Sequence, residues 1–324
     1  MIRVVAVLAV LLVLWFPVGH AQQAGKSWRI GFLGPPATTG AHLVAAFREG
    51  LREFGYVEGR NIVIEHRTTG GKDELADRLA AELVALKVDV LVVSITQNAV
   101  AAKRATSTIP IVMVNVGDPV ESGLVSSLAR PGGNITGLSR LTAETIGKNL
   151  EVLAEAVPQA SRVAVLWNRS NPLHPIMMAR TRDAAAALGL ALAEVHASAP
   201  SELENAFAAM AKERVSAALV LADGMYFLNR RHIADLALER RLPTMFQNSE
   251  HAQAGGLLSY SAESVDNYRR AATYVDKILK GARPGDLPIQ QPGRFELVVN
   301  LRTADRLGLS LPASLLLRAD VLIR

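Results

Sequence analysis

Three acidic residues, Asp118, Asp223 and Glu250, each follow a short apolar run closely. Such a run predicts a buried strand, and a carboxylate beyond its end can accept hydrogen bonds from an ammonium group. Ser94 and Thr96 follow another such run and stand at the start of a predicted helix, where free backbone N–H groups attract a carboxylate. These residue types predict the binding of a small polar ligand, and an amino acid fits both charges.

Helix capping could explain the position of one of these acidic residues, but it does not readily explain that of another. Asp118, Pro119 and Glu121 have the spacing of a helix capping box, so capping and ligand binding both stay open for Asp118. Asp223 directly follows the apolar run 217–222, and in open parallel sheets ligands bind beyond the carboxyl ends of the strands. The position of Asp223 therefore favours a ligand contact.

Three aromatic residues lie near the same predicted strand ends. Trp167, Tyr226 and Phe246 could contact an apolar or aromatic ligand side chain. Packing in the hydrophobic core is the alternative for these rings, and for Phe246 it is the favoured one.

Motifs of catalysis and cofactor binding are missing. Residues 25–27 (GKS) match the end of the phosphate-loop motif, but position 20 is His where that motif requires Gly, so the motif is not present. The sequence has no GxSxG or HExxH, and no GxGxxG follows a predicted strand. The histidines after His20 are never closer than 19 residues, so none forms a local metal-binding pair. We therefore expect no catalytic residue, no metal and no cofactor.

Apolar runs and helical patterns alternate along the chain, which predicts an α/β fold with parallel sheets. In the first half the predicted strands are 30–34, 61–66, 88–94 and 109–115, and the helices are 41–54, 73–87 and 98–105. In the second half the strands are 162–168, 190–196, 217–223 and 242–247, and the helices are 174–188, 201–213 and 227–240. Residues 131–137 are expected to form turns, followed by a connecting helix, 142–157. Later predictions are strands 257–261 and 294–300, helix 264–279 and loop 281–293.

The two halves resemble each other. Residues 29–33 (RIGFL) match 162–166 (RVAVL), and Ile109-Pro110 matches Leu242-Pro243, both at an offset of 133 residues. Two Rossmann-like lobes of one plan are therefore predicted. The elements after residue 256 are too few for a third domain, so we expect them to complete both lobes through several crossings that form a hinge. The predicted lobes are 27–141 with 256–288, and 142–255 with 289–324.

The loops beyond the predicted strand ends locate the candidate site, because facing lobes would enclose one cleft. These loops are 34–39, 94–98 and 115–118 in the first lobe, and 167–171, 223–226 and 247–250 in the second. The predicted ligand-binding residues are Thr38, Ser94, Thr96, Gln97, Asn115, Asp118, Trp167, Asn168, Asp223, Tyr226 and Glu250.

The first 21 residues have the pattern of a secretory signal. Arg3 precedes an apolar run of 13 residues, 4–16, and Gly19-His20-Ala21 is a small-residue cleavage site. A spanning helix needs about 20 apolar residues, so export with cleavage after Ala21 is the favoured interpretation. The chain of 324 residues contains no cysteine, which excludes a disulfide, a thiolate zinc site and a cysteine-linked lipid. Its net charge of +5 comes from scattered residues, so nucleic acid is not an expected partner.

Six segments resemble one group of ABC-transporter substrate-binding proteins. They are FREGLREFGYVEGRNI (47–62), AAKRATSTIPI (101–111), GDPV (117–120), LARPGGN (128–134), YRRAATYVDKILKG (268–281) and FELVVN (295–300). The resemblance implies a type I periplasmic-binding fold, and some relatives bind tryptophan, tyrosine or phenylalanine. It also implies site positions at Ser94, Thr96, Asn115, Asp118, Asn168 and Asp223.

The leading hypothesis is a monomeric periplasmic binding protein that delivers a small solute, an amino acid or a related aromatic compound, to ABC permease subunits. A periplasmic enzyme with Asp118 or Asp223 as general base is one alternative. A solute sensor that docks a membrane receptor is the other.

Overall fold

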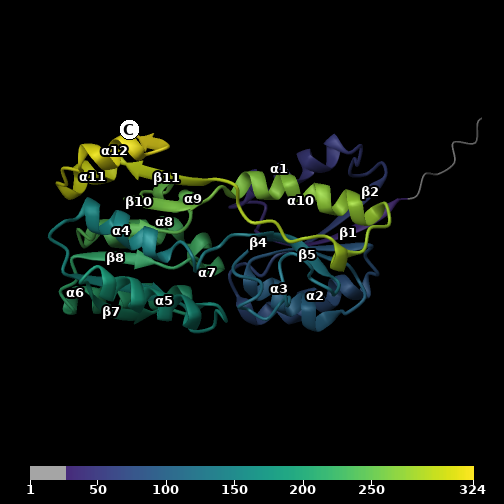
Figure 1. Ribbon diagram of the computed structural model, residues 1–324, viewed down its shortest axis with the longest axis horizontal. Helices are drawn as coiled ribbons and strands as arrows, with labels where there is room; N and C mark the ends of the chain where they lie inside the picture. Colours follow the sequence, from purple (N-terminus) through teal and green to yellow (C-terminus); the bar gives the residue numbers. More distant parts are fainter. Residues whose placement is uncertain (1–26) are drawn as a thin grey trace, which may run out of the picture.

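The computed structural model describes residues 27–324, and the predicted signal segment lies outside the described residues. Two lobes lie side by side along the long axis (Figure 1), each with its own β-sheet. Among residues 27–324, no helix has the length and hydrophobicity that crossing a membrane requires.

The first lobe is a parallel sheet of five strands in the order β2-β1-β3-β4-β5. Helix α10 packs along α1 on one face, and α2 and α3 pack together on the other. Strands β3 and β4 are buried along their whole length, as expected for a parallel sheet covered on both faces. The elements are β1 (Trp28–Leu33), α1 (Ala41–Glu53), β2 (Ile62–Arg67), α2 (Ala76–Ala85), β3 (Val90–Ser94), α3 (Thr96–Ala105), β4 (Ile111–Val116), β5 (Ile135–Ser139) and α10 (Ser264–Leu279).

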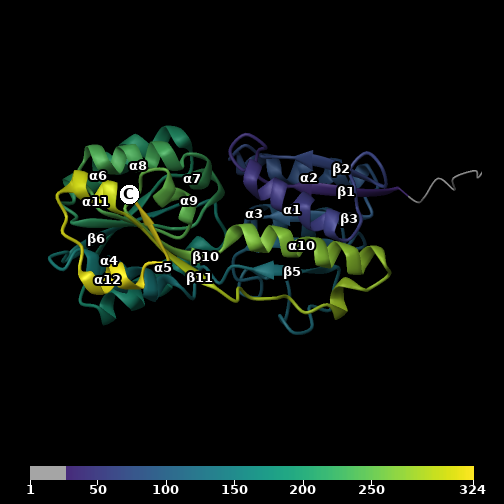
Figure 2. The ribbon, with the colours of Figure 1, turned by 90° about the horizontal axis from the view of Figure 1, so that it is seen from above.

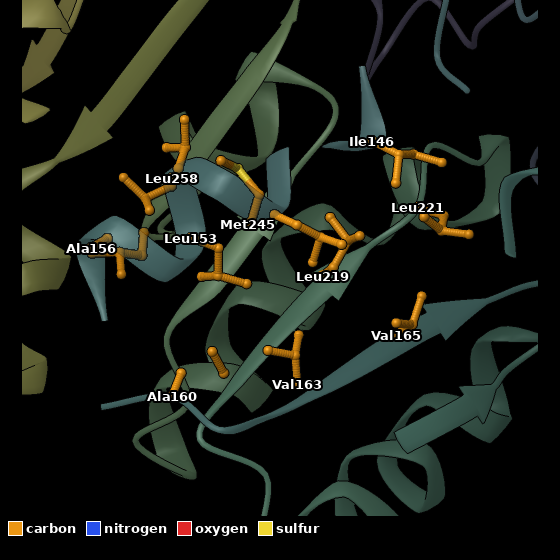
Figure 3. Packing of buried hydrophobic residues seen from close by; sticks show 14 of the residues in the cluster. Ile146, Leu153, Ala156, Ala160, Val163, Val165, Leu219, Leu221, Met245 and Leu258 are labelled. Atoms are coloured by element: carbon orange, nitrogen blue, oxygen red, sulfur yellow. The ribbon is translucent and has the colours of Figure 1, made fainter. Parts of the chain in front are cut away.

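The second lobe has seven strands in the order β12-β11-β10-β9-β8-β6-β7, and β10 and β11 are its antiparallel pair. Figure 3 shows Leu153 and Ile146 of α4 packing over β6, β8 and β10. The strands are β6 (Arg162–Trp167), β7 (Ala191–His196), β8 (Ala217–Val220), β9 (Thr244–Phe246), β10 (Leu258–Ala262), β11 (Phe295–Asn300) and β12 (Val321–Ile323). The helices are α4 (Ile146–Ala156), α5 (His174–Ala187), α6 (Leu203–Lys212), α7 (Gly224–Leu228), α8 (Arg230–Glu239), α9 (Ser249–Gln253), α11 (Leu301–Leu307) and α12 (Ala313–Arg318).

The predicted internal repeat is present in the strand order. The order β2-β1-β3-β4 in the first lobe corresponds to β7-β6-β8-β9 in the second. The matched sequence segments 29–33 and 162–166 both lie in the first strand of their lobe, where each pairs with two parallel neighbours. The two α/β lobes of one plan are therefore confirmed.

Several predicted elements differ from the observed ones. Residues 131–137 were expected to form only turns, yet Ile135–Ser139 is β5. Gly137 allows this strand, because a Cβ there would lie 2.2 Å from the Met113 carbonyl oxygen. The expected helix 227–240 is two helices, α7 and α8. The capping-box interpretation of Asp118 is wrong, because the residues that follow it form turns instead of a helix.

The chain crosses between the lobes at three places in the described residues: after β5, after β10 and before β11. Figure 2 shows the last crossing, which runs from the side of α10 to β11. Strand β10 pairs with β9 and β11 in the second sheet, whereas the expected boundary at 256 put it in the first lobe. Its backbone completes the second sheet, and the crossing follows it at Glu263.

Candidate functional site

A cavity lies between the lobes, beyond the carboxyl ends of β3, β4 and β8. Its empty volume, including the part open to solvent, is about 840 Å³. We call it the interlobe cavity. Its polar and charged lining residues are Thr68, Thr69, Ser94, Thr96, Gln97, Asn98, Asn115, Arg140, Thr142, Asn171, Asp223, Asn248, Glu250, Ser264 and Tyr268. Apolar lining residues include Leu43, Ile95, Leu173, Phe227 and Leu228.

The wall from the first lobe is the corner between β3 and α3. Ile95 forms this corner with φ 64° and ψ 155°, a conformation that β-branched residues rarely adopt. No side chain caps the start of α3, and the Thr96 hydroxyl instead accepts a hydrogen bond from the Gly117 N–H at 3.2 Å. The buried Asn98 Oδ1 atom has no hydrogen-bond partner. This corner therefore offers uncapped backbone and a free amide oxygen beside the cavity.

The corner of the second lobe, between β8 and α7, is organised by the carboxylate of Asp223. Its Oδ1 atom accepts from the backbone N–H groups of Met225 and Tyr226, at 2.9 and 3.4 Å, and so caps α7. Its Oδ2 atom accepts from three side-chain amides at 3.0–3.2 Å, those of Gln97, Asn168 and Asn171. A carboxylate has about four lone-pair positions, so these donors leave Asp223 little capacity for a ligand ammonium.

A buried histidine holds Asn168 beside Asp223. The Asn168 N–H donates to His174 Nδ1 at 2.8 Å, so the ring proton resides on Nε2, which lies 3.0 Å from the Ala222 carbonyl oxygen. Burial lowers the pKa of His174, even though Asp223 acts in the opposite direction. The neutral ring thus links the ends of β6 and β8, which positions both members of the Asn168–Asp223 pair.

Contacts between the lobes close the cavity. Gln97 on α3 donates to Asp223 at 3.1 Å, and Arg230 on α8 donates to the Thr39 carbonyl oxygen at 3.1 Å. His42 Nε2 lies 3.5 Å from Glu250 Oε1. Arg180 on α5 forms an ion pair with Glu121, which follows β4 of the first lobe. These contacts define a closed arrangement of the two lobes.

The closed arrangement places two carboxylates near each other. Gln97 Nε2 donates to Asp73 Oδ2 at 3.3 Å and to Asp223 Oδ2 at 3.1 Å, so one amide joins acidic groups from different lobes. Burial, followed by the charge of Asp223, raises the pKa of Asp73 to about 6. Glu250 shows the reverse: burial favours its neutral form, but hydrogen bonding with His42 and the charge of Arg140 outweigh it and lower the pKa.

Arg140 lines the cavity but was not among the residues predicted from the sequence. It follows β5 in the first crossing, and its Nη2 atom donates to the Gln247 carbonyl oxygen at 2.8 Å. Only 8% of its surface is exposed, and its Nε atom has no hydrogen-bond partner. The strand-end rule would have found Arg140 if residues 135–139 had been predicted as a strand.

The structure brings six of the eleven predicted site residues to the interlobe cavity: Ser94, Thr96, Gln97, Asn115, Asp223 and Glu250. Five predicted residues do not line it, and two of them lie close behind. Asn168 contacts the cavity residue Asp223. The side chain of Asp118 accepts from the Ala143 N–H at 3.0 Å and from Thr142 Oγ1 at 3.4 Å, so it fixes the first crossing.

The other three predicted residues point elsewhere. Tyr226 is completely buried in the second lobe, where its hydroxyl donates to the Ala197 carbonyl oxygen at 2.8 Å. Trp167 packs on the core of the same lobe beneath the Arg169 guanidinium, and Thr38 is exposed. Phe246 lies in the core, as favoured from the sequence. Strand-end position alone does not reveal which way an aromatic ring points.

A metal site is not evident in the described part of the chain. No group of three or more His, Asp or Glu residues between 27 and 324 is arranged to hold a metal ion.

Known proteins with the same architecture were found by sequence and by structure. A tyrosine-binding protein of Clostridioides difficile (strain R20291) is 27% identical over 263 residues, which are 81% of this chain and 75% of that protein. The crystal structure of a conserved domain protein from Vibrio cholerae is 28% identical with a TM-score of 0.85, covering 92% of this chain and 99% of that one.

A third relative has a bound amino acid. The crystal structure of an ABC domain in complex with L-Trp from Streptococcus pneumonia is 23% identical with a TM-score of 0.84, covering 92% of this chain and all of that one. The predicted type I periplasmic-binding fold is thus confirmed. The family model described as ABC transporter substrate binding protein matches residues 38–323. The chain therefore belongs to the family of ABC transporter substrate-binding proteins.

Proposed function

We propose that this protein is the periplasmic substrate-binding component of an ABC importer. It captures an amino acid or a related aromatic compound in the interlobe cavity and delivers it to permease subunits in the inner membrane. Family membership supports a binding role without catalysis. The relatives described as tyrosine-binding and as a complex with L-Trp support the ligand class.

The observation that carries this proposal is a set of buried polar atoms without partners in residues that line the interlobe cavity. Asn98 Oδ1, Arg140 Nε and Glu250 Oε2 are all buried, line the interlobe cavity and form no hydrogen bond within the protein. A buried polar atom without a partner costs free energy, about 1–3 kcal/mol for a neutral group and more for a charged one. A polar ligand that contacts these atoms recovers that free energy.

Closure is the proposed link between binding and transport. The unpartnered atoms belong to the first lobe, the first crossing and the second lobe, so a ligand can contact all three only when the lobes are together. A ligand with more contacts in the closed arrangement shifts the equilibrium toward it. The permease would then recognise the closed form of the two lobes.

A thermal-shift screen of the protein without residues 1–21 tests the binding role. The screen includes the twenty amino acids, aromatic acids, nucleosides and sugars. A ligand at 100 times its dissociation constant should add about 2.7 kcal/mol to the free energy of unfolding and raise Tm. The bound compound should be recovered unchanged after long incubation. Conversion to a product, or no shift with any compound, would contradict the proposal.

Export has its own test. The full chain, expressed in a Gram-negative host, should appear in the periplasmic fraction with Gln22 as its first residue. Retention in the cytoplasm with an intact N-terminus would contradict the periplasmic assignment while leaving the binding role untouched.

A further inference from the structure

Two buried charges of opposite sign line the interlobe cavity without forming an ion pair with each other. Arg140 and Glu250 are 8% and 5% exposed. Each acts electrostatically on the other, yet the charged or titratable side chain that Glu250 contacts in the described chain is His42, at 3.5 Å. An uncompensated charge in a protein interior is costly, so a direct contact would be expected if these two groups served the fold alone.

The remaining contacts of Arg140 fix its guanidinium and leave one edge free. Its Nη2 atom is held by the Gln247 carbonyl oxygen at 2.8 Å. With the Asn248 amide in the orientation that satisfies its neighbours, the Nη1 atom lies 3.0 Å from the Asn248 side-chain oxygen. The Nε atom has no partner. Two anchored nitrogens and one free nitrogen give a donor that is already oriented for an anion.

Glu250 likewise has one side-chain oxygen with a partner and one without. Its Oε1 atom lies 3.5 Å from His42 Nε2 of the first lobe, while its buried Oε2 atom has no partner. A carboxylate oxygen only accepts hydrogen bonds, so Oε2 requires a donor such as an ammonium group. The cavity is therefore lined by a cation that keeps one buried donor without a partner and by an anion that keeps one such acceptor.

We infer that Arg140 and Glu250 recognise the two charges of an α-amino acid, with Arg140 Nε donating to the carboxylate and Glu250 Oε2 accepting from the ammonium. This inference rests on the proposed function and specifies its ligand. An α-amino acid carries both charges on one carbon, so it can contact two groups that attract each other without touching. Its side chain would extend toward apolar lining residues such as Leu43, Phe227 and Leu228.

This assignment differs from the expectation drawn from the sequence. There, the carboxylate was placed at the start of α3 and the ammonium at Asp118, Asp223 or Glu250. Asp223 already accepts five hydrogen bonds, and the side chain of Asp118 contacts the first crossing. Glu250 is the acidic candidate that keeps a free buried oxygen.

The test combines two variants with three probes. The probes are the amino acid that binds most tightly among the twenty, its decarboxylated amine and its deaminated acid; for tyrosine these are tyramine and 3-(4-hydroxyphenyl)propanoate. Calorimetry gives Kd for each with the wild type, Arg140→Gln and Glu250→Gln. The wild type should prefer the amino acid over either analogue by about 10- to 100-fold, as expected for hydrogen bonds between charged groups.

The two variants should lose different preferences. Arg140→Gln should bind the amino acid and the amine within about 5-fold of each other while still rejecting the deaminated acid. Glu250→Gln should show the opposite pattern. Arg230→Gln is the matched control: Arg230 joins the lobes through Thr39 outside the cavity lining, so its loss should weaken all three probes alike. Urea denaturation shows that each variant is folded.

The affinities of the three probes show whether Arg140 and Glu250 contact the ligand. Equal weakening of all three probes by Arg140→Gln and Glu250→Gln would mean that the two charges only support the closed arrangement, which overturns it. A tight ligand that is not an α-amino acid would overturn it while leaving the binding function standing. Binding of no compound at all would contradict the proposed function itself.

Discussion

The two lobes repeat one strand order, yet their equivalent corners beside the cavity differ. At the second-lobe corner, β8–α7, the Asp223 side chain caps the helix and gathers three amides. At the first-lobe corner, β3–α3, the residue before the helix is Ile95, which caps nothing and has a positive φ of 64°. One corner satisfies its own polar groups, whereas the other leaves its helix start uncapped beside the cavity.

This difference suggests a division of roles between the repeated halves. The second-lobe corner is a stable surface that the first lobe docks on through Gln97. The first-lobe corner holds strained backbone and a free Asn98 oxygen, features that cost stability and that a ligand can compensate. In this repeated fold, the β8–α7 corner satisfies its own polar groups, whereas the β3–α3 corner has an uncapped helix start and an unpartnered oxygen that a ligand could contact.

The largest expected effect is on stability, and it comes from removing the carboxylate that organises the β8–α7 corner. Asp223→Ala should lower the free energy of unfolding by about 3 kcal/mol, because a helix cap is lost and buried amide donors are left without a partner. Urea denaturation measures this change. The control is Asp235→Ala on α8, where an exposed carboxylate lies 3.7 Å from Arg231, and it should cost less than about 0.5 kcal/mol. Equal effects would remove the contrast between the two corners.

The next largest effect is expected on ligand affinity, from a methyl group added between the lobes at Gly117. A Cβ on Gly117 would lie 2.4 Å from Leu173 of the second lobe and 2.6 Å from Thr142 Oγ1. Gly117→Ala should therefore weaken ligand binding about 10-fold or more, because overpacking of about 1–3 kcal/mol opposes closure. Gly133→Ala, where a Cβ would meet nothing, should bind as the wild type does. Unchanged affinity in Gly117→Ala would show that binding does not need this closed arrangement.

Because Asp73 and Asp223 lie near each other in the closed arrangement, we expect the free energy of unfolding to depend on pH. The pKa of Asp73 is about 6, above its ordinary value of 3.8, so the folded protein binds more protons than the unfolded chain between these values. The contribution of Asp73 to stability is therefore greatest below pH 4 and is lost as the pH rises through 6. Asp73→Asn should raise the free energy of unfolding at pH 7.5 by about 1 kcal/mol and reduce its slope between pH 4 and 6. A variant with an unchanged slope would refute this coupling.

The smallest effect is expected from an exposed ion pair between the lobes. Arg180 and Glu121 join the lobes through an ion pair whose side chains are about one-third exposed. Arg180→Ala should change ligand affinity by less than about 5-fold, and added salt should remove even that difference, because exposed ion pairs contribute about 0–1 kcal/mol. A larger loss that persists in high salt would mean that this ion pair, and not the Gln97–Asp223 contact, is the main contact between the lobes.

The sequence predicted the lobes better than it predicted the side chains of the site. Buried parallel strands are continuous apolar runs, so β3 and β4 were recognisable and the matched segments revealed the repeat. Strand β5 was missed because its Gly137 and the preceding Pro131-Gly-Gly stretch have turn composition. Arg140 was missed with it.

Errors at the site have a common physical cause. Position beyond a strand end brought Ser94 and Glu250 to the cavity, but it also selected Tyr226, which turns into the core. Asp223 was expected to bind the ligand, whereas its oxygens are occupied by donors 52 to 126 residues away as well as by its own helix. Such distant partners are set by tertiary structure, so local sequence cannot reveal whether a polar group is free.

Closure of the lobes on a ligand can be measured directly as the distance between them, with and without ligand. The chain has no cysteine, so spin labels can be placed at Lys72→Cys and Glu239→Cys, two exposed positions on different lobes. We expect a broad or double distance distribution without ligand and a single distribution, that of the closed arrangement, at saturation. A distribution that the ligand leaves unchanged would contradict closure of the two lobes as the binding event.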